Sequence, residues 1–144
     1  MTEKKEFKPK QNEHKKIKEL PKIESYYLDR HITAALNEVF DCYIIGANRA
    51  TSVISFAITE YLYKNIFYPE EGKKGKVIIK TLFERSFKQG FFSLEDYNLL
   101  KAFGETRNSH IHDISTEIKD KDVKLLLLIM IKILNAEKQT VLLS

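Results

Sequence analysis

The residues of this chain best suited to chemistry lie in the stretch AFGETRNSHIHD, where Arg107, Asn108, His110 and His112 fall within six positions. Histidine changes its charge near neutral pH, so it can take up or release a proton during a reaction. Arginine stays charged, and its planar guanidinium can hold two oxygens of a phosphate at once. The cluster is therefore suited to binding an anion and moving a proton. The alternative is a helix that ends in ordinary polar residues, with both histidines at the surface.

Helical periodicity places Arg107 in an unusual position. The apolar run LEDYNLLKAF leads into the cluster, and a helix that continued to Ile114 would put Arg107 in the middle of its apolar stripe. His110 falls on the same stripe, whereas Asn108 and His112 lie together on a neighbouring flank because they are four residues apart.

An arginine is almost never buried without a partner, so three arrangements are open for Arg107. In the first, the apolar stripe faces a cleft or a subunit interface. In the second, Arg107 pairs with an internal carboxylate such as Glu60. In the third, the helix breaks between Gly104 and Ser109 and redirects the side chains.

The elements that must position this cluster are predicted to be helices. Glycine and proline are scarce, at five and three residues, which indicates long helices with few breaks. Apolar residues at spacings of three and four predict helices over residues 24–45, 48–67, 77–90, 93–107 and 117–135, with a loop over 68–76. Gly46 and Gly90 end two of these helices, and Ser93 with Asp96 resembles a capping box. We expect an all-α, up-and-down bundle of about five helices.

The charge of the chain is unevenly distributed. Residues 1–20 hold seven lysines against four glutamates, with few large apolar side chains. We therefore expect a lysine-rich, disordered tail over residues 1–22 and one helical domain over residues 23–144. The tail either attracts a polyanion through counterion release or only keeps the protein soluble.

Several classes of protein are disfavoured by the sequence. A single cysteine, Cys42, cannot build a disulfide framework, and the HIH stretch lacks a third zinc ligand at suitable spacing, so we expect no metal and no cofactor. The longest apolar run, LLLLIMI, is far shorter than the roughly 20 residues that span a bilayer, and the first residues are not those of a signal peptide. We expect a cytoplasmic protein without a membrane anchor.

The run from Arg107 to His112, RNSHIH, matches the R-x4-6-H signature of the HEPN superfamily, with four intervening residues. Its surroundings are also similar to small bacterial HEPN proteins. The stretch ALNEVFDCYIIGANRATSVISFAITEYL resembles their paired first helices, and LFERSFKQGFFSLEDYNLLKAFGETRNSHIHD resembles the segment that leads into their catalytic arginine and histidine. The resemblance covers the chain from about Leu28 to Leu134.

This resemblance implies a helical domain that forms a two-fold dimer, with both motifs meeting in one composite cleft at the interface. Such a dimer would explain an arginine on an apolar stripe, since the stripe is then an interface. Active members of the family are metal-independent endoribonucleases, commonly toxins or antiphage and stress-response effectors. Their products would be a 2′,3′-cyclic phosphate and a 5′-hydroxyl.

The resemblance also implies roles for individual residues. His112 would be the general base or acid, Arg107 would stabilise the transition state, and Asn108 would orient the phosphate or His112. His110 either touches the substrate or is a packed or capping residue. Glu60 either supports the site or pairs with a structural arginine such as Arg49.

Two other interpretations stay open. One is a non-catalytic HEPN module that serves as a dimeric scaffold, binding nucleotide or RNA, or that works with a partner protein such as a nucleotidyltransferase. The other is an interaction protein whose lysine-rich segment binds nucleic acid or acidic partners. For the nuclease, the expected partners are RNA, a second copy of the chain and a cognate antitoxin or modifying enzyme.

Overall fold

The computed structural model describes residues 3–73, 79–112 and 117–142, and the side chains of residues 106–112 lie outside the described part. Within these ranges the chain is mostly helical, as predicted, with one small two-stranded sheet. The helices of ten residues or more are α2 (Arg30–Ile44), α3 (Asn48–Leu62), α5 (Ile79–Lys88), α6 (Leu94–His112) and α7 (Asp120–Asn135). The shorter elements are β1 (Lys5–Phe7), α1 (Lys15–Lys18), β2 (Ile23–Ser25), the π-helical turn η1 (Tyr63–Phe67), α4 (Pro69–Lys73) and α8 (Lys138–Leu142).

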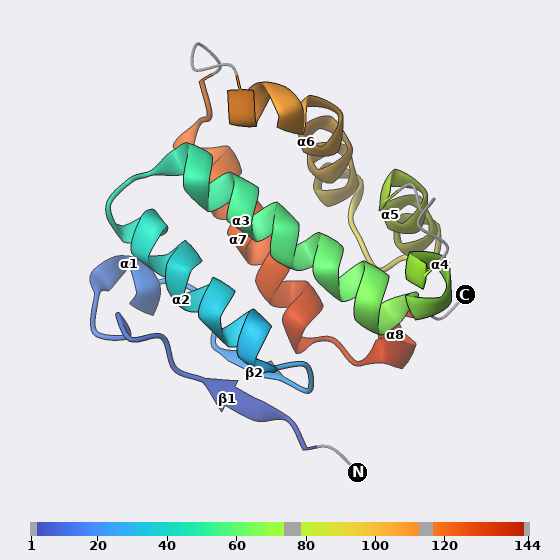
Figure 1. Cartoon of the computed structure of the whole chain (residues 1–144), viewed down its shortest axis with the longest axis horizontal. Helices are drawn as coiled ribbons and strands as arrows, with labels where there is room; N and C mark the ends of the chain where they lie inside the picture. Colours follow the sequence, from blue (N-terminus) through green and yellow to red (C-terminus); the bar gives the residue numbers. More distant parts are fainter. Residues whose placement is uncertain (1–2, 74–78, 113–116, 143–144) are drawn as a thin grey trace.

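Helices α3 and α7 lie side by side at the centre of the molecule (Figure 1). Helix α2 packs on one side of α3, with α1 and the β1–β2 ribbon beyond it, and α6 and α5 lie on the other side (Figure 1). The end of α6 and the start of α3 are found at the same end of the molecule. The central pair of α3 and α7 therefore supports α6, the helix in which the Arg107–His112 run lies.

Helix α3 contains a row of small hydroxyl residues that are buried. Thr51, Ser52, Ser55 and Thr59 are all buried, and each hydroxyl donates to the backbone carbonyl four residues earlier at 2.7 to 3.0 Å. These bonds satisfy the four hydroxyl groups within α3 itself. The leucine-rich α7, which packs against α3, is itself buried on most of its faces.

An aromatic cluster joins the end of α3 to α5. The Tyr63 ring is fully buried and meets Phe83 edge to face, with ring centroids 5.0 Å apart. The Tyr63 hydroxyl shares a hydrogen bond of 2.8 Å with the buried Ser86 hydroxyl. Because burial disfavours the charged phenolate, the pKa of Tyr63 is raised above its usual value. These contacts help to hold α5 beside α6.

The N-terminal segment is ordered where the structure describes it, which differs from the expected disordered tail. Strand β1 pairs antiparallel with β2, with Phe7 opposite Ile23. Phe7, Ile17, Leu20 and Ile23 are at most 9% exposed and join the core. These four apolar residues are widely spaced among lysines, so composition underestimated them. Together they bury enough apolar surface to hold residues 3–25 against the bundle.

The same segment is tied to α2 by polar contacts. The Lys16 ammonium donates to the Tyr43 carbonyl at 2.6 Å and lies 4.4 Å from the centre of the Tyr43 ring. A cation at the last turn of a helix is favourable because the helix dipole is negative there. The Gln11 side chain donates to the Asp41 carboxylate, two residues earlier in the same helix.

Some predicted boundaries are wrong. The helix predicted from Glu24 starts at Arg30, because Asp29 caps it by accepting the Ile32 amide at 2.8 Å, and residues 23–25 form β2 instead. Part of the predicted loop over residues 68–76 is the short helix α4. The last long helix begins at Asp120 rather than near Glu117. The ends at Gly46 and Gly90 are confirmed, since both have positive φ, 76° and 84°.

Candidate functional site

Helix α6 carries the predicted cluster and is unbroken from Leu94 to His112. The predicted cap is present, because the Asp96 amide donates to the Ser93 hydroxyl at 3.1 Å. A break between Gly104 and Ser109, one of the three arrangements considered for Arg107, is therefore wrong. The whole run from Arg107 to His112 forms the last turns of one helix.

One row of α6 faces the core. Leu100 is 1% exposed and Phe103 is 4% exposed, and the Phe103 ring lies 5.3 Å from the Phe56 ring of α3. Gly104 also lies against Phe56, since a Cβ at this position would be 3.4 Å from the ring. Because α6 is unbroken, Arg107 occupies the next helical position on this row, four residues after Phe103.

The side chains of Arg107, Asn108, His110 and His112 lie outside the described residues, so their contacts and directions form no part of the site's geometry. Their backbone positions are described. His112 is the last residue of α6, five residues after Arg107. The two main candidates are thus separated by about 7.5 Å along the helix axis, at a rise of 1.5 Å per residue.

Glu60 is described in full and lies near this region. Its side chain is 16% exposed and forms an ion pair of 3.0 Å with Lys64, four residues further along the chain. Glu60 lines a cavity of about 320 Å³ between α3, α5 and α6 that Gly104 also lines. The structure therefore brings Glu60 to the same cavity as the position one turn before Arg107. A direct pair of Glu60 with Arg49 is excluded, because eleven residues of helix separate them by about 16 Å.

The cavity beside α6 is lined partly by lysines and glutamates. The Lys80 ammonium on α5 forms an ion pair of 3.2 Å with the Glu105 carboxylate on α6. Lys101 lines the same cavity. The carboxylates of Glu60 and Glu105 offset the charges of Lys64 and Lys80 and leave that of Lys101. The net charge of the lining is therefore only weakly positive.

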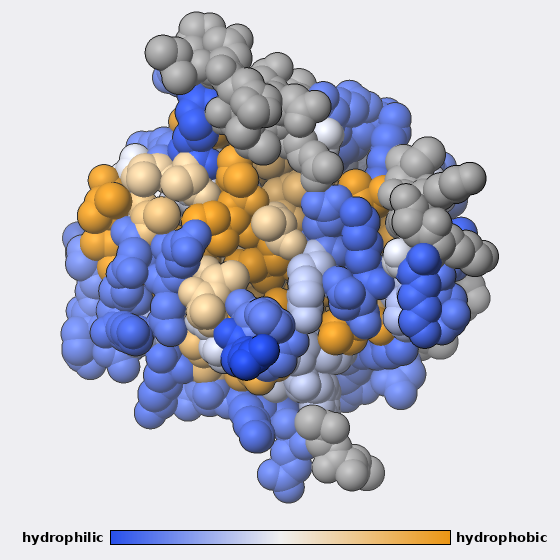
Figure 2. Space-filling model, in the orientation of Figure 1, coloured by the Kyte–Doolittle hydropathy of each residue, from blue (hydrophilic) through white to orange (hydrophobic). Residues whose placement is uncertain are grey.

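A shallow apolar hollow of about 520 Å³ lies over the first turns of α3, lined mainly by Ala47, Ala50, Val53 and Ile54. In the preceding turn, Ile45 is 78% exposed. In Figure 2, which has the orientation of Figure 1, apolar residues are exposed over α3. An exposed apolar surface of this kind is typical of an interaction site.

The start of α3 is joined to the segment that follows α6. The Asn48 side chain donates to the Ile118 carbonyl at 3.1 Å and to the Asp120 carboxylate at 2.6 Å. These bonds connect the first turn of α3 with the first turn of α7. The apolar hollow and the end of α6 are therefore parts of one end of the molecule (Figure 1).

Other chemical groups in the described residues are poor candidates. Burial, followed by the carboxylates of Glu38 and Asp41, raises the pKa of the Cys42 thiol, which weakens it as a nucleophile. No three histidine, cysteine, aspartate or glutamate side chains in the described ranges are grouped so that they could hold a metal ion. None of the helices in these ranges has the length and apolar character needed to cross a membrane.

Sequence reasoning missed two features of this end of the molecule. The close approach of Gly104 to Phe56 was not predicted, although a glycine inside a helix is a signal for such packing. The apolar hollow on α3 was also missed, because periodicity alone cannot separate a buried face from an exposed one.

No family model matches this chain, and neither a curated protein nor a solved structure matches it significantly. Its function has to be inferred from its own residues.

Proposed function

We propose that this chain is a metal-independent endoribonuclease of the HEPN type, in which Arg107 and His112 act on RNA at the interface of a homodimer. The observation that carries the proposal is the helical position of Arg107. It follows Leu100 and Phe103 on the core-facing row of an unbroken α6. An arginine at such a position needs an anionic partner, and an RNA phosphate supplies one.

The apolar hollow on α3 supports the dimer. Four of its six lining residues, Ala47, Ala50, Val53 and Ile54, are apolar, as the core of a subunit interface is, and Asn48 and Arg49 complete the lining. It lies at the same end of the molecule as the end of α6. A two-fold contact through this surface brings together the last turns of α6 from both copies.

In the proposed reaction, His112 takes the proton of a ribose 2′-hydroxyl, and the 2′-oxygen then attacks the adjacent phosphorus. The bond between phosphorus and the 5′-oxygen breaks, and that oxygen receives a proton from the partner's His112. The Arg107 guanidinium holds the non-bridging oxygens while negative charge accumulates on them. The products are a 2′,3′-cyclic phosphate and a 5′-hydroxyl, and no water or metal ion is consumed.

The supporting residues have smaller roles in this proposal. The Asn108 amide orients the phosphate or His112, and His110 contacts the flanking nucleotide. Glu60 orients Arg107 from α3, because it lines the cavity that Gly104 also lines. In the cell, the enzyme is a toxin, antiphage or stress-response effector, silenced by a cognate antitoxin or a nucleotidyltransferase.

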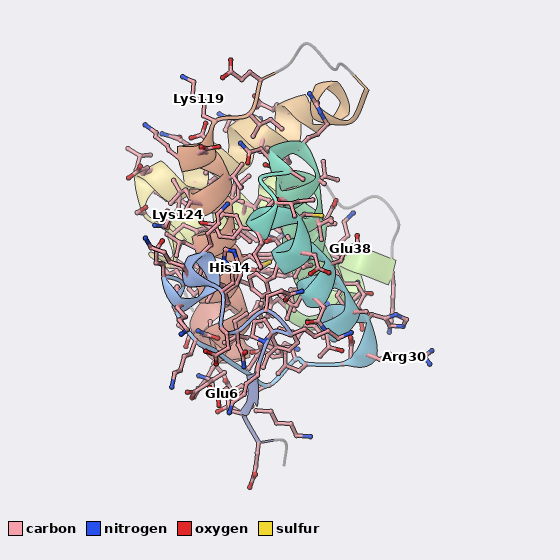
Figure 3. The ribbon with its side chains drawn as sticks, turned by 90° about the vertical axis from the view of Figure 1, so that its left-hand side faces the viewer. Glu6, His14, Arg30, Glu38, Lys119 and Lys124 are labelled. Atoms are coloured by element: carbon pink, nitrogen blue, oxygen red, sulfur yellow. The ribbon has the colours of Figure 1, made fainter. Side chains whose placement is uncertain are left out.

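Cleavage of RNA by the purified full chain in the presence of a metal chelator tests this proposal. Arg107→Ala and His112→Ala are compared with Arg30→Ala and His31→Ala, which remove the same residue types from the exposed start of α2, where Arg30 points away from the molecule (Figure 3). We expect a loss of about 10²–10³-fold in rate for the first pair and no change for the second. The cleaved ends should be a cyclic phosphate and a 5′-hydroxyl. Undiminished cleavage by either site variant contradicts the assignment.

The dimer has a separate test. Ile54→Glu places a charge in the apolar hollow, and Leu94→Glu places one at the opposite end of α6, where Leu94 is 60% exposed. We expect Ile54→Glu to be a monomer by sedimentation and to lose cleavage, whereas Leu94→Glu keeps both properties. A wild-type chain that sediments as a monomer while cutting RNA contradicts the composite site.

The second candidate is a HEPN module that binds nucleotide or RNA without cutting it. The Lys80–Glu105 and Glu60–Lys64 ion pairs reduce the positive field beside α6, so either candidate would depend on Arg107 to hold RNA there. This module binds RNA through Arg107 but does not arrest growth when expressed. Growth arrest that His112→Ala relieves favours the nuclease.

A further inference from the structure

The ordered N-terminal segment encloses a cavity on the side of α2 away from α6. Its volume is about 390 Å³, within the range of roughly 300–1,000 Å³ that is usual for small-molecule sites. The floor is apolar and consists of Phe7, Ile17, Leu20, Ile23 and Phe40. Figure 1 shows the elements that frame it, β1, α1 and β2 against α2.

The rim of this cavity is positively charged. Lys8, Lys18 and Lys22 line it, against one carboxylate, that of Glu6. Within the described ranges, Lys8 and Lys22 form no ion pair. Lys18 pairs with Glu13 at 3.2 Å, but both side chains are more than half exposed, so the pair is easily exchanged for another anion. An anion of charge two or more fits this rim better than a single carboxylate does.

The frame of the cavity is partly rigid. Pro9 and Pro21 are on its rim, and proline fixes the backbone angle φ. The backbone N–H of Asn12 donates to the Pro9 carbonyl at 3.1 Å, and this bond closes the turn on the rim. A preformed cavity loses less conformational freedom when a ligand binds.

The aromatic floor and one side-chain amide favour a planar polar ring as the uncharged part of the ligand. The Phe7 and Phe40 rings stack with centroids 6.4 Å apart, and Phe7 keeps some exposure, 9%, toward the cavity. The Asn12 side chain on the rim can both donate and accept hydrogen bonds, as the edge of a nucleobase also does. An alkyl chain would leave this amide unused.

We propose that this cavity binds a nucleoside phosphate, with the base over the apolar floor and the phosphate between Lys8 and Lys22. The ligand is either a free nucleotide or the terminal nucleotide of an RNA strand, which share this chemistry. The site is independent of Arg107 and His112, so it stands even if the chain cuts no RNA. It differs from a diffuse lysine tail because one ligand saturates it.

The test uses the full chain and three probes: ATP, inorganic phosphate, and a 2′-O-methyl octanucleotide with and without a 5′-phosphate. The 2′-O-methyl group removes the attacking hydroxyl, so cleavage cannot interfere. Binding is measured by calorimetry and mapped by amide chemical shifts. The double variant Lys8→Gln with Lys22→Gln is compared with Lys5→Gln and Lys15→Gln, which removes the same charge from exposed positions of the same segment outside the cavity.

We expect one ATP or one 5′-phosphorylated strand per chain, with shifts confined to residues 6–23 and Phe40. The cavity variant should bind at least about tenfold more weakly, since two charge-assisted contacts are lost, and the control less than twofold more weakly. Binding of ATP identifies a free nucleotide, and binding of only the phosphorylated strand identifies an RNA end. The proposal is overturned if both variants weaken binding equally, if inorganic phosphate binds as tightly as ATP, or if neither ATP nor the strand binds.

Discussion

Replacement of Gly104 by alanine tests the packing of α6 on α3, on which the candidate site depends. The new Cβ would lie 3.4 Å from Cζ and 3.8 Å from Cε2 of Phe56, which is ordinary contact at its short limit. Gly104 has no positive φ and lies inside α6, so alanine fits its backbone. Alanine in a helix interior is favoured over glycine by about 1 kcal/mol. We expect Gly104→Ala to stabilise the fold by about 0.5–1 kcal/mol and to raise the Tm by about 2–4 °C.

Gly90→Ala is the control for this substitution. Gly90 has a φ of 84°, and alanine pays about 1–2 kcal/mol in that region. Urea unfolding followed by circular dichroism gives both free energies from the same assay. A destabilised Gly104→Ala variant beside an unaffected Gly90→Ala variant would refute the described packing. Gly104→Leu, whose side chain cannot fit beside Phe56, should displace α6 and reduce RNA cleavage.

Individual side-chain contacts in the N-terminal segment and at the ends of the central helices can be tested in the same way. Lys16→Met removes the ammonium from the Tyr43 carbonyl and ring, so it should cost about 1 kcal/mol and expose the N-terminal segment to proteolysis; unchanged cleavage by trypsin near residue 10 contradicts this. Burial, with the Glu137 carboxylate, raises the pKa of Tyr27 to about 12, so the unfolded chain loses this proton first and stability falls as the pH rises from about 10 to 12. Tyr27→Phe should therefore show a shallower loss of stability with alkaline pH, and an equal slope is the opposing result. Asn48→Ala removes two hydrogen bonds between α3 and the start of α7, so it should cost about 1–2 kcal/mol in urea unfolding, and a cost near zero would show that the pair is dispensable.

Local signals in the sequence predicted several boundaries correctly. Ser93 caps α6, and Gly46 and Gly90 end their helices with positive φ. These features depend on a few neighbouring residues, so the sequence contains all that decides them. The start of α2 was missed although Asp29 is a local capping signal, whereas the strand at residues 23–25 forms by pairing with β1, a distant segment.

The N-terminal segment shows the limit of composition as evidence. Eight lysines between residues 4 and 22 predicted disorder. Phe7 and Ile17 nevertheless pack with Phe40 and hold the segment on α2. Composition averages over residues, whereas folding depends on whether the few apolar side chains reach a common surface.

The sequence by itself determined that the chain is mostly helical, and it placed Arg107, Asn108, His110 and His112 close together after an apolar helical run. It did so because helix periodicity and capping are local properties. Only the tertiary structure decided that α6 continues unbroken past Gly104 and that Glu60 lines a cavity beside it. The apolar hollow on α3 and the lysine-rimmed cavity are also tertiary features. Exposure and cavities depend on which helices meet, and contacts between residues far apart in the chain decide that.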